Sequence, residues 1–235
     1  MRQQYLDFLG REPDPGGQAY WTSRITDCGA DASCILNHRI DVSAAFIVEP
    51  EFQDSGYFLY RIYKASYGRL PLFGEYTADR GQVVGGPNLE SSKQAFADGW
   101  VQRSAFKQIY PPTMGASDFV NRLFDTAQLF PYAAERQQEI DALLNTPKTR
   151  AQVLRDVIEI PEFRTREYNP AFVLMEYFGY LRRDLDPGGY DFWLNVLNNR
   201  EPNNYRGMVC AFITSAEYQH RFSAFVTHTN AECGQ

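Results

Sequence analysis

The sequence repeats itself about every 55 residues, and this internal repetition is the feature that most constrains the fold. An eight-residue pattern that closes on an aromatic side chain occurs four times. The closing aromatic residues are Phe52, Phe106, Phe163 and Tyr218, separated by 54, 57 and 55 positions. A period of this size is typical of helical repeats, in which each unit buries its apolar face against a neighbour. The predicted units are residues 1–56, 57–115, 116–169 and 170–225, followed by a tail at 226–235.

A second pattern opens the first and the last of these units. Residues 5–21 read YLDFLGREPDPGGQAYW, and residues 177–193 read YFGYLRRDLDPGGYDFW. Asp14 and Asp186 suit a helix N-cap, and the proline after each suits the first helical position, where no backbone donor is needed. In the third unit we expect Thr146 to be the cap, with the proline after it at the first helical position. Each unit is therefore predicted to be helix, tight turn, helix, short loop and helix, with units two and three degenerate.

The spacing of apolar residues indicates an all-α fold. Phe192, Trp193, Val196 and Leu197, which follow the last Asp-Pro-Gly-Gly turn, have the spacing of one helical face. Alternating β-branched runs closed by Asn-Gly or Asp-Gly are absent from the sequence. We predict four degenerate helical repeats packed into one compact or solenoid-like array.

Residues 71–92 interrupt the second unit with a glycine-rich stretch that has little helical periodicity. We expect a loop longer than an ordinary connection in a compact domain. Such a loop is either a contact segment for a ligand or partner, with Tyr76 and Asn88 as its candidate residues, or a surface insertion that costs little loop entropy.

The four cysteines suggest disulfide bonds. Cys28 and Cys34 flank a short loop, for which a disulfide staple is the simple interpretation, since a zinc site would need a second pair at ligand spacing. Cys210 and Cys233 are either a bridge that ties down the tail or, for the helical Cys210, a small buried apolar residue. Disulfides favour an oxidising compartment. The first residues lack the apolar run of a signal peptide, so we expect an extracytoplasmic protein that is part, or the mature form, of a longer exported chain.

Charge excludes two classes of partner. A net charge of -6 has the wrong sign for a protein that neutralises phosphates or docks on an anionic membrane. The sequence also contains no run of about 18 apolar residues. We predict neither nucleic-acid binding nor membrane insertion.

The common sequence motifs of catalysis are absent. The chain has no Gly-rich phosphate loop, Gly-x-Ser-x-Gly elbow or His-Glu-x-x-His, and its three histidines are scattered. The stretch from Asp184 resembles the start of a calcium loop, but Asn195 stands where a bidentate Glu is expected. We predict no catalytic residue, no metal and no cofactor.

Some residues recur at matching positions of the repeats. Arg11, Arg69 and Arg183 follow the first helix of their units, where they form either a row of recognition groups or a structural contact with the helix end. Trp21 and Trp193 are either core residues or a stacking platform for sugars. The structural interpretation is favoured for both sets.

Residues 9–21 (LGREPDPGGQAYW) and 211–218 (AFITSAEY) resemble the bacterial family DUF4214, a domain of unknown function, over essentially the whole chain. The form with the two cysteines of the first loop is similar to C-terminal segments of large secreted or surface proteins of acidobacteria. The resemblance implies an all-helical, extracytoplasmic accessory module with no assigned activity. The family is distantly similar to phycobilisome linker domains, which bind proteins but are typically basic, whereas this chain is acidic.

These features predict a non-catalytic helical module for protein–protein or cell-surface attachment, self-association included. Its partners would be other proteins or surface polymers. Two alternatives stay open. The aromatic content suits a carbohydrate-binding module. A hydrolase without a recognised motif would show a pocket that holds two close carboxylates with shifted pKa values.

Overall fold

Helices make up 73% of the protein, and residues 1–233, which the computed structural model describes, contain no β-strand. The all-α prediction is therefore confirmed. The chain forms two compact units. Unit 1 combines Met1–Gln53 with the chain from Asn169 onwards, and unit 2 is Asp54–Tyr168. The number and bounds of the repeats stay a prediction, and the predicted tail at 226–235 is described as far as Cys233.

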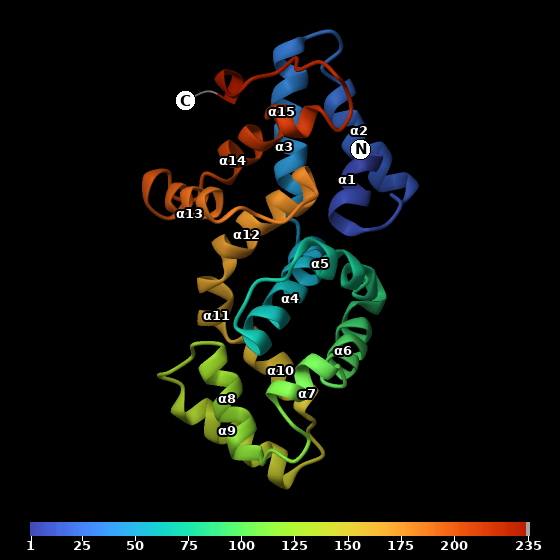
Figure 1. Cartoon of the computed structure of the whole chain (residues 1–235). Coiled ribbons are helices and arrows are strands. Elements are labelled where there is room, and N and C mark those ends of the chain that lie inside the picture. Colours follow the sequence, from blue (N-terminus) through green and yellow to red (C-terminus); the bar gives the residue numbers. More distant parts are fainter. Residues whose placement is uncertain (234–235) are drawn as a thin grey trace. The chain divides into compact units, whose positions relative to one another are not determined.

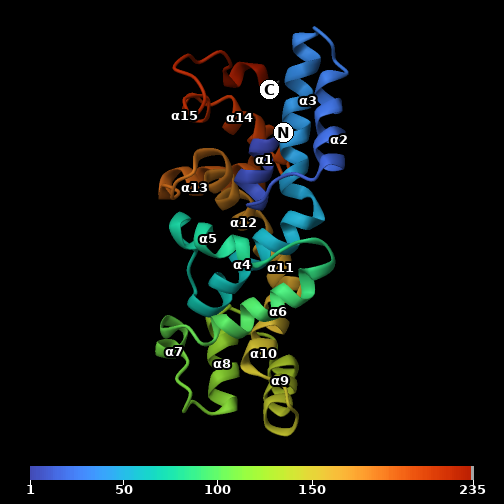
Figure 2. The ribbon, with the colours of Figure 1, turned by 90° about the vertical axis from the view of Figure 1, so that its right-hand side faces the viewer.

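Unit 1 is built from the two ends of the chain. Its N-terminal elements are α1 (Arg2–Gln4), the π-helix η1 (Tyr5–Leu9), α2 (Pro15–Thr26), α3 (Ala32–Val48) and the first residues of α4 (Pro50–Tyr67). Its C-terminal elements are α12 (Tyr168–Glu176), the π-helices η4 (Tyr177–Leu181) and η5 (Val196–Arg200), α13 (Pro187–Asn195), α14 (Tyr205–Ile213), α15 (Ala216–Gln219) and the 3₁₀ turn η6 (Asn230–Cys233). Helix α3 packs against α2 and α14, and Figures 1 and 2 both show α2 beside α3.

Aromatic side chains from both ends of the chain form the core of unit 1. The ring of Phe8 in η1 lies 4.9 Å from that of Tyr180 in η4. The ring of Tyr5 lies 4.9 Å from that of Phe46 in α3. A Cβ atom at Gly179 would lie 2.2 Å from the Phe8 ring, so this approach of η1 to η4 requires a glycine.

Unit 2 contains the rest of α4 and the elements that follow it. These are α5 (Phe73–Asp79), the 3₁₀ turns η2 (Arg80–Gln82) and η3 (Gly86–Asn88), α6 (Leu89–Trp100), α7 (Ser104–Ile109), α8 (Ala116–Thr126), α9 (Ala133–Asn145), α10 (Arg150–Glu159) and α11 (Pro161–Arg166). Helix α10 packs against α6 and α8, and α8 packs against α9 (Figure 1). Trp100 is fully buried in this unit, and its Nε1 donates to Ser66 Oγ at 3.0 Å.

The expected long loop at 71–92 is wrong, because this segment folds into α5 and two 3₁₀ turns before α6 begins. Helix α5 begins through a cap contact that periodicity does not reveal: the backbone N–H of Leu72 donates to Glu75 Oε2 at 2.8 Å. The guanidinium of Arg69 holds the same carboxylate through two hydrogen bonds of 2.7 Å. Local polar contacts thus replace apolar spacing as the signal for this helix.

The expected cap at Thr146 is also wrong. Thr146 ends α9, and its hydroxyl donates to the carbonyl of Ala142 at 2.7 Å. Helix α10 begins three residues later than expected, with Thr149 as its N-cap in a reciprocal contact with Gln152. A Thr with a Gln three residues later is the stronger start signal, because it satisfies two backbone donors instead of one.

Four residues at matching positions of the predicted units share one backbone conformation. Each follows the first helix of its unit, and each has a left-handed backbone: Gly10 (φ 66°), Gly68 (φ 68°), Gln128 (φ 56°) and Arg182 (φ 56°). This conformation ends a helix sharply and is usually reserved for glycine. The same helix end therefore occurs with two different residue types beside glycine.

None of the helices in the described part of the chain is long and apolar enough to cross a membrane.

Candidate functional site

The three repeated arginines are engaged in ion pairs. Arg11 donates to both carboxylate oxygens of Glu51 at 2.9 Å, and Arg183 does the same to Glu217 at 2.6 and 3.1 Å. Arg69 binds Glu75 in the same bidentate way. Bidentate pairs of this kind fix both side chains in one geometry. The three arginines are therefore held by carboxylates of their own unit, a structural contact like the interpretation that the sequence favoured over a row of recognition groups.

Each of these guanidinium groups also lies over a tyrosine ring of the preceding helix. Arg11 lies 5.0 Å from the ring centroid of Tyr5, and Arg183 lies 5.1 Å from that of Tyr177. In the first and fourth predicted repeats the arginine thus joins the first helix to the last helix, where the glutamate precedes the closing aromatic residue. Arg69 instead binds Glu75 of α5. Sequence reasoning missed the glutamates, although Glu51 and Glu217 occupy the same place in two copies of the eight-residue pattern.

The two Asp-Pro-Gly-Gly turns cap helices, as predicted. The N–H of Gly17 donates to Asp14 at 2.8 Å, and the N–H of Gly189 donates to Asp186 at 2.7 Å. The hydroxyl of Tyr177 lies against the second turn, where a Cβ atom on Gly189 would be only 2.1 Å from it. Burial, followed by the negative charge of Asp186, raises the pKa of Tyr177 to about 12. The turn is therefore part of the packing between helices, and its aspartates are explained without calcium.

The two glycines of this turn are expected to respond in opposite directions to alanine. Gly188→Ala should stabilise the protein by about 0.5 kcal/mol, because it meets no atom within 4 Å and alanine favours the helix. Gly189→Ala should destabilise it by about 2 kcal/mol, because the new methyl group meets Tyr177 and Asp186. Urea denaturation of the two variants and the wild type measures both effects. Equal effects of the two substitutions would contradict the close approach of Tyr177.

The repeated tryptophans are half-buried at the edge of the unit 1 core. The ring centroid of Trp21 lies 5.5 Å from that of Phe46, and the centroid of Trp193 lies 5.5 Å from that of Phe212. Each tryptophan therefore contributes one face to the core while part of its ring stays at the surface. This placement lies between the two interpretations, core residue and exposed platform.

The two candidate residues of segment 71–92 differ in exposure. Asn88 ends η3 and is exposed. Tyr76 is only 2% exposed, because α5 turns this side chain into the interior of unit 2, and burial raises its pKa. The hypothesis that Tyr76 contacts a ligand or partner at the surface is therefore wrong.

The predicted Cys28–Cys34 bond is present, and so is the Cys210–Cys233 bond, one of the two alternatives for that pair. Cys28–Cys34 closes the loop between α2 and α3, and Cys210–Cys233 ties the end of the described chain to α14. The first bond has a neighbour that the sequence analysis missed: His38 Nδ1 lies 3.2 Å from Cys28 Sγ. The sequence could have indicated this contact, because His38 lies one helical turn after Cys34. Because the two sulfur atoms are bonded to each other, they are not available as thiolate ligands for a metal.

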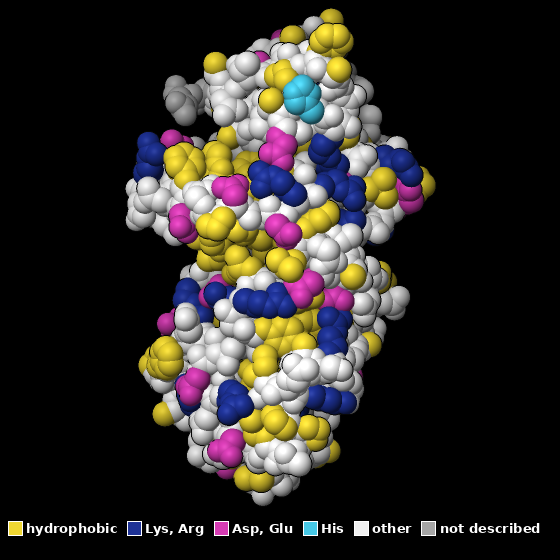
Figure 3. All heavy atoms as spheres, viewed as in Figure 1, with side chains coloured by type: hydrophobic (Ala, Val, Ile, Leu, Met, Phe, Trp, Pro, Cys, Tyr) yellow, Lys and Arg dark blue, Asp and Glu magenta, His cyan; other side chains and the backbone are white. Residues whose placement is uncertain are grey.

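The segment after α15 exposes three large apolar side chains. Phe222 is 55% exposed, Phe225 is 78% exposed and Val226 is 43% exposed, and we call these three residues the tail surface. The buried side chain of Gln219 holds the segment, because its Oε1 accepts the backbone N–H of Thr227 at 2.8 Å. In Figure 3, hydrophobic side chains reach the surface of unit 1 next to a histidine.

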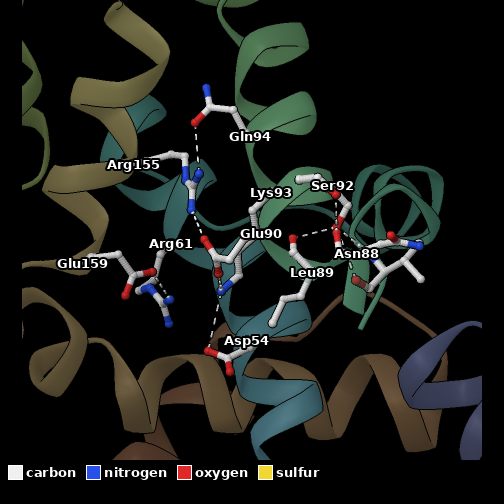
Figure 4. A network of polar contacts seen from close by, with 12 residues as sticks. Asp54, Arg61, Asn88, Leu89, Glu90, Ser92, Lys93, Gln94, Arg155 and Glu159 are labelled. Carbon is white, nitrogen blue, oxygen red and sulfur yellow. Dashed lines mark hydrogen bonds and ion pairs between the residues drawn. The ribbon is translucent and has the colours of Figure 1, made fainter. Parts of the chain in front are cut away.

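A chain of charged side chains connects three helices of unit 2 (Figure 4). Lys93 on α6 is buried, and its Nζ lies 3.6 Å from Asp54 on α4 and 3.3 Å from Glu90. Arg155 on α10 donates to Glu90 at 2.6 Å and to Gln94 at 2.9 Å. The charges of this network neutralise one another, so its evident role is to tie α4, α6 and α10 together.

Two further contacts of unit 2 belong to the same region. Arg61 is buried and donates to Glu159 Oε1 at 2.7 Å, as Figure 4 shows. Lys148 Nζ lies 2.6 Å from Glu139 and 2.5 Å from Asp156. Burial raises the pKa of Glu139, and Lys148 opposes this effect. The ammonium group of Lys148 thus bridges the carboxylates of Glu139 and Asp156.

Comparison with known proteins gives one finding. Residues 156–222 match the family model described as domain of unknown function (DUF4214). This match is narrower than the whole-chain resemblance and covers the end of the third predicted repeat and most of the fourth. No curated protein and no solved structure matches the chain.

Proposed function

We propose that the protein is a non-catalytic helical module for attachment to proteins or surface polymers, including other copies of itself. The proposal rests on the site itself, because the description of the family model that residues 156–222 match assigns no function. We further propose that it works outside the cytoplasm. Two disulfide bonds support this location, since such bonds persist in oxidising compartments.

The observation that carries the proposal is the tail surface. Exposed apolar residues that are scattered singly need no explanation, but three of them within five positions mark a contact surface. The segment is also anchored, because Gln219 holds its backbone and the Cys210–Cys233 bond closes the chain behind it. An anchored apolar surface can bind a partner without the entropic cost of ordering a loop on binding.

Sedimentation at increasing protein concentration tests self-association through this surface. We expect the wild-type mass to rise with concentration and Phe225→Ser to reduce the rise, because the most exposed apolar side chain of the tail surface is removed. Phe130→Ser is the matched control, since Phe130 is 67% exposed but lies in unit 2. Equal effects of the two variants, or a monomer at every concentration, would count against self-association through the tail surface.

A second candidate function, carbohydrate binding, is favoured by two aromatic pairs in unit 1, each of which joins an exposed ring to a half-buried tryptophan. Tyr20 is 54% exposed beside Trp21, and Phe192 is 49% exposed beside Trp193. Aromatic faces of this kind stack on sugar rings in many binding modules. If this function holds, a glycan array should give signals with the wild type that disappear in a Tyr20→Ala, Phe192→Ala double variant. A silent array would remove this candidate and leave protein attachment in place.

A further inference from the structure

Unit 1 contains a cavity of 360 Å³ between α3, the α14–α15 segment and the chain that follows α15. Its size falls at the lower end of ligand-binding cavities, which span about 300 to 1,000 Å³. Most of its wall is apolar, and the side chains that matter for the argument are Ile25, Leu36, Val42, Ile213, Phe222 and Phe225. A lining of this composition takes up an apolar body and excludes water from it.

The charged groups of the cavity have one sign. No aspartate or glutamate of the described residues lines it, although the chain as a whole carries a net charge of -6. Arg39 on α3 lines it and has no ion-pair partner among residues 1–233, whereas Arg11 and Arg183 in the same unit are paired with glutamates. An unpaired guanidinium at an apolar cavity is the arrangement that recognises a carboxylate or sulfonate head group.

The wall formed by the tail is held in place from two sides. The side chain of Gln219, itself part of the lining, accepts the N–H groups of Thr227 and His228 at 2.8 and 3.0 Å and donates to the carbonyl of His228 at 2.9 Å. Farther along, Cys233 is bonded to Cys210 of α14. The cavity is thus preformed, and its outer wall depends on a disulfide bond.

We propose that this cavity binds a small amphipathic anion, with the apolar body between α3 and the tail and the anionic head group at Arg39. The inference goes beyond attachment to a partner, because its ligand enters the molecule. It stands on the lining and charge of the cavity, whether or not the outer faces of Phe222 and Phe225 hold a partner.

Isothermal titration with decanoate, decanol and decyltrimethylammonium tests the proposal on the full chain. Decanoate should bind at one saturable site and more tightly than the cation. Arg39→Gln should weaken decanoate binding about fivefold and leave decanol binding unchanged, since it removes the ion pair but not the apolar wall. The matched control is Arg24→Gln, because Arg24 is exposed in the same unit but does not line the cavity. No saturable binding, equal affinity for anion and cation, or equal effects of the two variants would overturn the proposal.

A second variant tests the wall. Replacing Cys210 and Cys233 by serine should weaken the binding of both decanoate and decanol, because the tail is released from α14. Circular dichroism checks that the helices remain, and unchanged affinity in a folded variant would contradict the role of the tail. Sedimentation of Arg39→Gln should match the wild type, so a failure of ligand binding and a failure of self-association are separate results.

Discussion

Glu159→Ala is expected to lower the free energy of unfolding of unit 2 by about 3 kcal/mol, because it leaves a buried positive charge without its partner. The side chain of Arg61 is 6% exposed, and its Nη2 donates to Glu159 at 2.7 Å. Burial lowers the pKa of Arg61, and the carboxylate of Glu159 opposes that shift. Glu159 itself is 37% exposed, so water can reach Arg61 and replace part of the interaction with the lost carboxylate. The expected destabilisation therefore lies at the lower end of the range measured when one partner of a buried ion pair is removed.

Two further variants show whether the loss comes from the uncompensated charge. Arg61→Met combined with Glu159→Ala should recover most of the stability, since an apolar side chain needs no counter-ion. Arg164→Ala is the matched control: Arg164 also donates to Glu159, at 3.0 Å, but is exposed, and its loss should cost less than about 0.5 kcal/mol. Urea denaturation, with hydrogen exchange of α4 and α10, measures all three. If Glu159→Ala costs no more than Arg164→Ala, the buried charge is not what this pair stabilises.

Glu176→Gln is expected to make the protein more stable than the wild type at neutral pH. Glu176 is fully buried in unit 1, and neither of its carboxylate oxygens has a hydrogen-bond partner among the described residues. Burial raises its pKa well above the ordinary value of 4.5. The folded protein therefore keeps this proton at a pH at which the unfolded chain has released it.

The direction of the pH dependence follows from this difference. Below about pH 4.5 Glu176 is protonated in both the folded and the unfolded state, so its ionisation makes no difference to the free energy of unfolding relative to Glu176→Gln. Above pH 4.5 the ionisation of Glu176 in the unfolded state lowers the free energy of unfolding of the wild type by about 1.4 kcal/mol for each pH unit. This decrease continues until the pH reaches the raised pKa of the folded state. The difference between Glu176→Gln and the wild type should therefore grow as the pH rises from 4.5.

Urea denaturation of both proteins between pH 4.5 and 7.5 measures this difference, and other titrating groups cancel in the comparison. Glu167→Gln is the matched control, since Glu167 is also buried but accepts from Tyr60 at 2.8 Å and from Arg166 at 3.0 Å. Its replacement should destabilise the protein at neutral pH because it removes the ion pair with Arg166. A stability difference for Glu176→Gln that does not change with pH would contradict a protonated Glu176.

The parts of the structure that could be predicted depend on residues close together in the chain. The caps at Asp14 and Asp186 each involve a donor three residues away, and the Cys28–Cys34 bond closes a loop of a few residues. The failures arose where several local signals compete. At Thr146 and Thr149 two adjacent caps were possible, and the complete reciprocal contact at Thr149 decided the start of α10.

The sequence by itself determined the all-α class, the two Asp-Pro-Gly-Gly caps and the Cys28–Cys34 bond, because helix periodicity, capping and short loop closure act within a few residues. It left the Cys210–Cys233 bond open, because these two cysteines are 23 positions apart. Only the tertiary structure decided which charged side chains form ion pairs and which do not. Arg11 reaches Glu51 across 40 positions, whereas Arg39 has no ion-pair partner among residues 1–233. The cavity beside Arg39 and the burial of Glu176 likewise arise from both ends of the chain meeting in unit 1, since burial and charge pairing depend on long-range packing that no local pattern records.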